Sequence, residues 1–391
     1  MNVSPVALHS TRGVRDALRG HGWADGRASD AAGGIHPLAL HLTGLSQDAL
    51  EALVRVGGSL GLEVVTGDDW ALLAGSRSRL SALARPWTVP EVLAETAVQV
   101  GLALPPDPAV GPWLTARGPI SLDAPVLMGI LNVTPDSFSD GGRYRGADAG
   151  LAQAEVLLEE GAGIVDVGGE STRPGRESDV PVGEELARVV PVIDALVRAH
   201  SDLPISIDTV KSEVARAALE HGAAIVNDVS AFRLDPAMAS VAAAAGAGVA
   251  LMHSRGSILE LASYRHAQYP GGVVAEVVSE LRAAMAAAAA GGVATERIVL
   301  DPGLGFSKTV EQNVELFDQL AALEALGRPV LVGPSRKRFL GALTDAPLDQ
   351  RDRATAVACA LAWERGARIF RVHAVAAARE ALALTRAVGA A

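Results

Sequence analysis

The stretch VLMGILN at residues 126–132 is apolar along almost its whole length, ends on an asparagine, and is followed by helical periodicity. The same arrangement recurs seven times, each time as a strand-length apolar run that leads to a polar or charged residue. These runs are GIVDVGGE (163–170), PISID (204–208), AIVND (224–228), GVALMH (248–253), RIVLD (297–301), PVLVGPSRK (329–337) and RIFRVH (368–373). Strands of this kind are buried on both faces, as in parallel sheets with helical crossovers. Eight in succession predict a closed (β/α)8 barrel, with the polar residues gathered at the rim where the strands end.

The barrel accounts for only part of the chain, because such barrels typically need about 250 residues and this sequence has 391. The surplus precedes residue 120 and has its own pattern of elements. Segments 38–44, 62–68 and 70–76 are typical of strands, and Ser46 is placed to cap a helix that follows it. The sequence therefore predicts a small α/β module at residues 1–118, of no assigned role, followed by a catalytic barrel at residues 119–391.

Composition narrows the class of protein. A hydrophobic content of 49% with 20% charged residues is typical of a globular protein. The net charge of −11 argues against a nucleic-acid partner, which would need a basic face. No segment has the features of a signal peptide or a membrane span. Cys359 is the only cysteine, so no internal disulfide can form, and we expect an inert buried thiol in a cytoplasmic protein.

One pair of rim residues indicates a binding site by itself. Arg371 and His373 alternate along the last strand and should point the same way, with Val372 opposite. A guanidinium and an imidazole on one edge make an anion site, and barrels commonly bind phosphate near strands seven and eight. No group of His, Cys and carboxylates has the spacing of a structural zinc site.

The rim segments together resemble a known family. MGILNVTPDSFSDGG (128–142) and DVGGESTRPG (166–175) are similar to the two signature segments of dihydropteroate synthases. The resemblance continues, in family order, through SIDTVK (206–211), NDVSAF (227–232), LMH (251–253), DPGLGFSKT (301–309), SRK (335–337) and RVH (371–373). It implies a transferase of folate biosynthesis that condenses 6-hydroxymethyl-7,8-dihydropterin diphosphate with 4-aminobenzoate, giving 7,8-dihydropteroate and pyrophosphate.

The resemblance also implies which residues hold the pterin. Asp301 and Asn227 would bind the edge that carries the 2-amino group and ring N–H, since a carboxylate accepts such an edge bidentately. Lys337 would bind the region of the pterin carbonyl and assist catalysis. Asp208 would bind the pterin and stabilise positive charge on its methylene, because in the family the bond to diphosphate is thought to break before the amine attacks.

The other ligands are assigned in the same way. Asn132, Arg371 and His373 would bind the diphosphate, and Asn132, with Asp136 as a second ligand, would hold Mg²⁺, which prefers oxygen ligands. The 4-aminobenzoate would lie among Thr172, Arg173, Pro174 and Phe306, and closure of the loop that carries catalytic Arg173 would exclude water. The resemblance further implies a homodimer formed through barrel helices, and competitive inhibition by sulfonamides.

Several alternatives stay open at this point. Asp301 could be a helix cap or part of an internal ion pair, Asp208 could cap the helix that begins near Lys211, and Lys337 could belong to a solvated charged face. His253 fits a wall residue better than a catalyst. A pterin-binding methyltransferase barrel and a non-catalytic pterin-binding paralogue compete with the synthase, although neither needs all the segments present. Whether Pro334 and Arg338 alter the 4-aminobenzoate pocket is also open.

Overall fold

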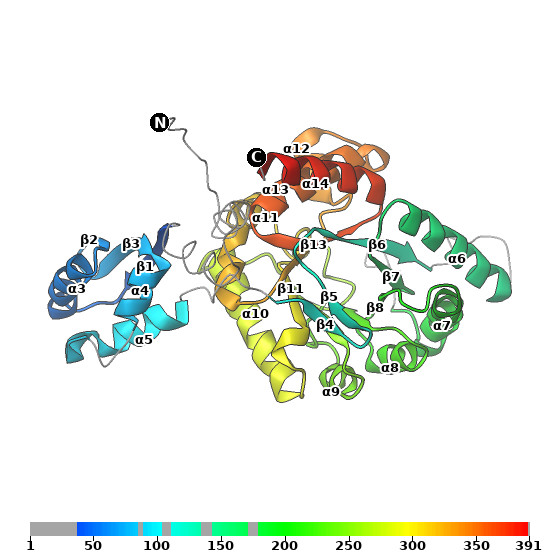
Figure 1. Ribbon diagram of the computed structural model, residues 1–391, viewed down its shortest axis with the longest axis horizontal. Coiled ribbons are helices and arrows are strands. Elements are labelled where there is room, and N and C mark those ends of the chain that lie inside the picture. The colour runs from blue at the N-terminus through cyan, green and yellow to red at the C-terminus, as the bar shows by residue number, and fades with distance from the viewer. Residues whose placement is uncertain (1–36, 85–88, 104–110, 134–142, 171–178, 390–391) are drawn as a thin grey trace, which may run out of the picture. The chain divides into compact units, whose positions relative to one another are not determined.

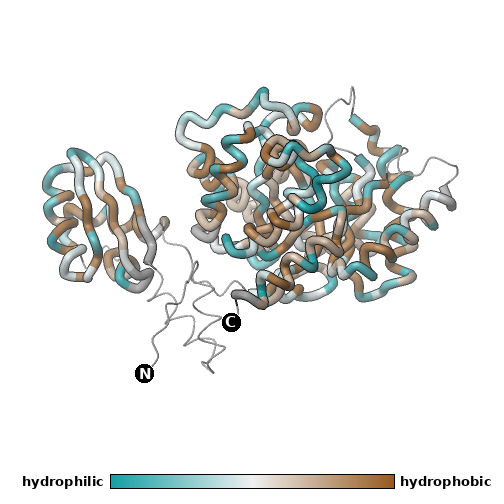
Figure 2. The backbone as a smooth tube through the Cα atoms, turned by 90° about the horizontal axis from the view of Figure 1, so that it is seen from above, coloured by the Kyte–Doolittle hydropathy of each residue, from teal (hydrophilic) through white to brown (hydrophobic). Residues whose placement is uncertain are grey.

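The computed structural model describes residues 37–84, 89–103, 111–133, 143–170 and 179–389. The chain divides into two compact units, the second of which comprises residues 110–323 and 328–388. The short segment around Trp113 belongs to the barrel unit because this side chain is fully buried among barrel residues. Hydrophobic stretches, drawn brown, run through both units (Figure 2).

The N-terminal unit is a small two-layer α/β fold, as predicted. Its elements are β1 (Pro37–Thr43), α3 (Gln47–Ser59), β2 (Glu63–Thr66), β3 (Trp70–Ser76), α4 (Arg77–Leu83), η2 (Glu91–Leu93) and α5 (Ala94–Ala103). The strands form an antiparallel sheet in the order β1-β3-β2. Ser46 is the predicted N-cap, since its side chain accepts a hydrogen bond from the Ala49 N–H. Leucines of α3 and β3 form the buried core, which gives this unit a hydrophobic interior of its own.

The second unit is the predicted closed parallel barrel, shown in Figure 1. Its strands are β6 (Val126–Asn132), β7 (Ile164–Gly168), β8 (Ile205–Asp208), β9 (Ile225–Asp228), β10 (Gly248–Met252), β11 (Ile298–Asp301), β12 (Val330–Val332) and β13 (Ala367–Val372). Each pairs with the next in chain order, and β13 pairs with β6 to close the ring. The prediction of eight barrel strands is therefore confirmed.

Helices follow the strands and cover the barrel. They are α6 (Arg143–Glu159), α7 (Val182–Ala199), α8 (Ser212–Glu220), α9 (Ala237–Ala244), α10 (Val273–Ala290), α11 (Val310–Asp318), α12 (Arg338–Thr344), α13 (Asp352–Glu364) and α14 (Val375–Gly389), with short 3₁₀ turns η4 (Thr295–Arg297), η5 (Leu320–Leu326) and η6 (Leu348–Gln350). The helix α11 ends at Asp318 and is followed by η5, and α12 begins directly after Lys337, the last residue of the run PVLVGPSRK.

A hairpin closes the end of the barrel opposite the strand C-termini. It consists of β4 (Trp113–Thr115) and β5 (Gly118–Ile120). Trp113 packs against inward-facing residues of the strands, among them Met128, Ile164 and Ala250, and its indole N–H donates to the Arg297 carbonyl at 2.8 Å. Because this floor is apolar and filled, polar chemistry is confined to the other end.

Two expectations about the chain as a whole can be checked on the described residues. Cys359 is fully buried in α13, as predicted, and burial raises the pKa of its thiol to about 12. Within the described ranges, none of the helices combines the length and the apolar character needed to cross a membrane.

Candidate active site

Four side chains from four different strands meet at the C-terminal end of the barrel. Arg371, from β13, donates through Nε to Asp166 Oδ2 at 2.6 Å and through Nη2 to Asp208 Oδ2 at 2.5 Å. Asn227, from β9, donates to the same Asp166 oxygen at 3.2 Å. Burial raises the pKa of the Asp208 carboxyl, and the neighbouring Arg371 guanidinium opposes that rise. The arrangement holds one guanidinium rigidly at the rim between two carboxylates.

Asp166 is the most important residue of this group that the sequence analysis missed. It lies in the middle of β7, is fully buried, and its Oδ1 atom is buried without a hydrogen-bond partner. An acidic residue inside an otherwise apolar strand was the available signal, because buried carboxylates are almost always paired. Its partners come from strands that lie 61 and 205 residues further along the chain.

Glycine keeps the space between Asn132 and Asp208 open. A Cβ atom added at Gly168 would lie 3.6 Å from Asp208 Oδ2 and 3.8 Å from Asn132 Oδ1. The two oxygens therefore border one small volume above the end of β7. Asp208 does not cap a helix, as one alternative had it, because the N-cap position of α8 is Lys211 and Asp235 accepts from the first N–H of that helix.

Asp301 and Lys337 form the adjoining part of the site. The Asp301 Oδ1 accepts from the Gly303 N–H at 2.7 Å, while Oδ2 faces the gap left by Gly333, 3.9 Å from where a Cβ would lie. The Arg371 Cβ borders the same gap at 3.8 Å, so the two halves of the site adjoin. Burial raises the pKa of Asp301, and Lys337 opposes the rise.

Lys337 is directed into the site rather than into solvent. Its ammonium donates to the Leu304 carbonyl and lies 3.6 Å from the centroid of the Phe306 ring. Burial lowers the pKa of Lys337 to about 7, and Asp301 opposes this shift. The preceding Arg336 turns away and makes a two-pronged ion pair with Asp352, both bonds being 2.7 Å. The solvated-face alternative is therefore wrong for Lys337.

The remaining predicted residues have the following positions. His373 comes just after β13 and its Nδ1 lies 2.9 Å from Ser335 Oγ, while Val372 is fully buried on the opposite side, as the alternation predicted. Phe306 is nearly buried in an apolar cluster with Met252 and Leu261. The predictions for Asp136, Thr172, Arg173 and Pro174 fall on residues outside the described ranges.

A second ionic cluster lies at the base of the segment that contains Thr172 and Arg173. Lys211 bonds to Glu170 and, at 2.5 Å, to Glu185, and the other Glu170 oxygen accepts from the Val180 N–H at 3.1 Å. Glu185 is fully buried and Glu170 nearly so. One carboxylate thus links both flanks of the 171–179 segment to the start of α8.

This cluster leads to a prediction about stability. Replacing Lys211 by Met removes the cation that bonds to both Glu170 and the fully buried Glu185, which should lower the free energy of unfolding by about 3–5 kcal/mol. Urea denaturation followed by circular dichroism would measure it, with Lys211→Arg as the charge-conserving control expected to lose much less. Equal stability of the Met variant and the unmodified protein would show that the ion pairs contribute nothing.

Comparisons with known proteins agree with this geometry. The family model described as pterin-binding enzyme matches residues 128–373. The dihydropteroate synthase of Mycobacterium leprae is 49% identical over 266 residues, which cover 66% of this chain and 92% of the relative. That of Synechocystis is 46% identical over 256 residues, covering 64% and 86%. The solved structure of the Xanthomonas albilineans enzyme with 4-aminobenzoic acid superposes with a TM-score of 0.64 at 46% identity, covering 70% of this chain and 96% of that one.

The family match begins two residues into β6 and ends just after β13, so it spans the whole strand ring that carries the site. The resemblance inferred from the rim segments is confirmed, and with it the barrel that presents them. By sequence, by fold and by the residues gathered at the strand ends, this chain belongs to the dihydropteroate synthases of the pterin-binding enzyme family.

Proposed function

We propose that the barrel condenses 6-hydroxymethyl-7,8-dihydropterin diphosphate with 4-aminobenzoate, forming 7,8-dihydropteroate and pyrophosphate. The observation that carries the proposal is Arg371, held between Asp166 and Asp208 and adjoining the Asp301–Lys337 pair across the Gly333 gap. An anion-binding guanidinium thus lies beside a carboxylate suited to a planar donor edge. The substrate presents both groups, a diphosphate and a pterin, joined by one methylene.

The pterin is bound by Asp301, with Asn227 contributing its amide. A buried carboxylate that has one oxygen facing a gap is well placed to accept two parallel N–H groups. Asn227 is fixed in orientation by its bond to Asp166, so it is preorganised for the same ligand. Lys337 is close enough to Asp301 for the two charges to shift each other's pKa, and it would donate to the pterin carbonyl.

Asp208 supplies the electrostatic part of the chemistry. When the C–O bond to the diphosphate breaks, its electron pair leaves with pyrophosphate and positive charge develops on the methylene. Diphosphate oxygens that bind Arg371 compete with Asp208 for the guanidinium, which leaves the Asp208 carboxylate beside the developing charge. The aromatic amine then forms the new C–N bond and loses a proton, so no protein nucleophile is required.

The 4-aminobenzoate lies against Phe306, whose ring already stacks on the Lys337 ammonium. This cation–π contact places a positive charge close to where the carboxylate or ring of the second substrate would pack. Thr172, Arg173 and Pro174 are proposed to complete this side and to exclude water, which competes with the amine for the cation. We also expect sulfonamides, which resemble 4-aminobenzoate, to inhibit competitively with it.

The residues present fit Mg²⁺ as the cofactor. Among the described residues no cluster of three or more His, Cys, Asp or Glu could hold a metal by itself, but Asn132 offers an amide oxygen beside the open space at Gly168. Mg²⁺ usually takes few protein oxygens and completes its shell with phosphate and water. Asn132, with Asp136 as a second proposed ligand, would hold it; when bound, the ion neutralises charge on the departing diphosphate.

A homodimer is proposed on a feature of the outer helices. Val357 and Leu361 are 59% and 44% exposed and lie four residues apart on one face of α13, and Leu384 of α14 is 68% exposed. Exposed apolar patches on helices are typical of oligomer interfaces. We propose a cytoplasmic location as well, since the single cysteine of the chain precludes an internal disulfide.

The dimer can be tested by charge insertion. Val357→Glu combined with Leu361→Glu should convert a dimer into a monomer in sedimentation velocity experiments, because two buried carboxylates at an interface are strongly unfavourable. Val156→Glu is the matched control, since Val156 of α6 is also exposed (45%) but lies outside the proposed interface. A monomeric unmodified protein, or a dimer that tolerates both glutamates, would contradict the proposal.

A pyrophosphate-release assay tests the function itself. Release is expected only when pterin diphosphate, 4-aminobenzoate and Mg²⁺ are all present. A methyltransferase-type barrel would release none, and a non-catalytic paralogue would bind pterin without turnover. Release that does not depend on 4-aminobenzoate would also contradict the proposed reaction.

A further inference from the structure

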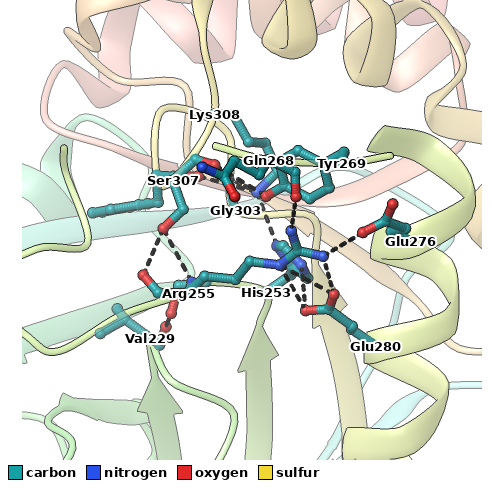
Figure 3. A network of polar contacts seen from close by, with 12 residues as sticks. Val229, His253, Arg255, Gln268, Tyr269, Glu276, Glu280, Gly303, Ser307 and Lys308 are labelled. Atoms are coloured by element: carbon teal, nitrogen blue, oxygen red, sulfur yellow. Dashed lines mark hydrogen bonds and ion pairs between the residues drawn. The ribbon is translucent and has the colours of Figure 1, made fainter. Parts of the chain in front are cut away.

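Lys308 is a buried lysine that the proposed chemistry does not use, and burial lowers the pKa of its ammonium group to about 7. Only 1% of its surface is exposed, yet its ammonium has three acceptors within reach: His253 Nδ1 at 2.9 Å and the carbonyl oxygens of Gly303 and Phe306, each at 3.1 Å (Figure 3). A lysine ammonium has three N–H donors, so all of them are satisfied. Two of the acceptors belong to the loop that immediately precedes Lys308.

Three residues of that loop, residues 303–307, have positive φ angles. Gly303 (φ 69°), Gly305 (φ 81°) and Ser307 (φ 49°) all adopt left-handed conformations, the last without the freedom of a glycine. For a residue other than glycine such a conformation persists only where surrounding contacts stabilise it, and here that residue is Ser307. Lys308 donates hydrogen bonds to two carbonyl groups of the loop. Ser307 is held separately, because its hydroxyl accepts from the backbone N–H of Arg255 at 3.0 Å.

The same loop directly supports Lys337. The Leu304 carbonyl accepts from the Lys337 ammonium, and the Phe306 ring lies beneath it at 3.6 Å. The contact is close enough that a Cβ at Gly305 would lie 2.3 Å from Lys337 Cδ. The position of the Lys337 side chain therefore depends on the conformation of three successive loop residues.

The geometry points to Lys308 as a positioning residue: its three hydrogen bonds fix loop 303–307 so that Leu304 and Phe306 hold Lys337 at the 4-aminobenzoate side of the site. The assignment concerns how Lys337 is held, and its kinetic consequence rests on the function proposed above. Lys308 itself is buried behind the loop and is not a catalytic residue.

His253 provides the third acceptor for the Lys308 ammonium. Its Nε2 lies 3.0 Å from Glu280 Oε2, and burial lowers the pKa of its imidazole to about 4, so the ring is neutral. A neutral ring that donates through Nε2 presents Nδ1 as an acceptor, which is what Lys308 requires. Glu280 is shared with Arg255, which links α10 to the loop through one continuous network (Figure 3). The wall role predicted for His253 agrees with this position.

The sequence permits a direct test, because it contains only three lysines, Lys211, Lys308 and Lys337. Protein grown with lysine labelled at ¹³Cε should give three assignable signals. Phe306→Leu removes the ring under Lys337 and defines the shift of its signal when that contact is lost. Lys308→Met should delete one signal and move the Lys337 signal by a comparable amount, because the ring no longer lies in place. Lys211→Arg is the matched control, which deletes a different lysine signal and leaves that of Lys337 unchanged.

Steady-state kinetics test the functional consequence of the positioning role. Loss of the loop contacts in Lys308→Met should raise the KM for 4-aminobenzoate about tenfold, equivalent to one or two hydrogen bonds. The dissociation constant for free pterin should rise as well, because Lys337 is proposed to donate to the pterin carbonyl and Gly303, which Lys308 holds, donates to Asp301. Glu276→Gln, at the far end of the Arg255 network, should change neither constant.

The outcomes separate the two proposals. An unshifted Lys337 signal in Lys308→Met overturns the positioning role whether or not the enzyme condenses its substrates. A shifted signal in a protein that never releases pyrophosphate leaves the positioning intact and refutes the proposed function. Should the Met variant fail to fold, Lys308→Gln, which keeps one polar group in the loop, is measured against the same two references.

Discussion

Replacing Arg371 by methionine should both destabilise the barrel and abolish use of the pterin diphosphate. The guanidinium is the cation that compensates Asp166, which is fully buried and already has one oxygen without a partner. Removing one member of a buried ion pair typically costs about 3–5 kcal/mol, which urea denaturation would detect. Loss of a charged contact made to the diphosphate should lower kcat/KM by roughly two to three orders of magnitude, while affinity for free pterin should fall much less.

A double variant separates the two effects. Adding Asp166→Asn to Arg371→Met removes the uncompensated charge, so most of the unfolding free energy should return. Activity should stay lost, because nothing replaces the anion-binding guanidinium. Activity that recovers together with stability would mean that Arg371 acts only as a structural counter-ion, and equal losses of diphosphate and free-pterin binding would refute its proposed ligand.

Asp208→Asn is expected to lower turnover with little effect on stability or pterin affinity. The amide preserves the shape of the carboxyl group but not its charge, and Arg371 keeps its bond to Asp166. Removing one preorganised electrostatic group commonly costs about 10²–10³ in rate, and single-turnover kinetics would measure it at the chemical step. An exposed carboxylate outside the site, Asp202, provides the control as Asp202→Asn. A single-turnover rate constant unchanged by Asp208→Asn would exclude charge stabilisation by this residue.

The eight strands and the rim residues could be predicted because a buried parallel strand leaves a direct trace in sequence. Asp208 and Asp301 each end such a strand and Asn227 is one residue from the end of another, so their meeting at one edge follows from topology. Asp166 does not stand at a strand end but inside an apolar run. Its ion pair with Arg371 is evident only from the three-dimensional structure. Lys308 was hidden for a similar reason, since the strain of loop 303–307 is a property of backbone angles.

The boundaries of segments were harder to predict from the sequence, for a different reason. Four of the five tryptophans precede residue 120, which marks that part of the chain as different in composition, but Trp113 belongs to the barrel interior. Composition records how often a residue type occurs and not which core it enters. The helix α12 was missed because PVLVGPSRK was taken as strand to its end, whereas the strand stops at Val332 and Lys337 is already the N-cap of the next helix.

The hairpin that carries Trp113 has a practical consequence for anyone who wants the catalytic half alone. A truncated protein that starts near Ser121 would lose Trp113. The inner residues Met128 and Ile164 would then be exposed to water at the end of the barrel that the hairpin closes. Its inactivity would then be mistaken for proof that the N-terminal module takes part in catalysis. A truncated protein that starts before Gly111 keeps Trp113 in the barrel, so its activity would report on the N-terminal module alone.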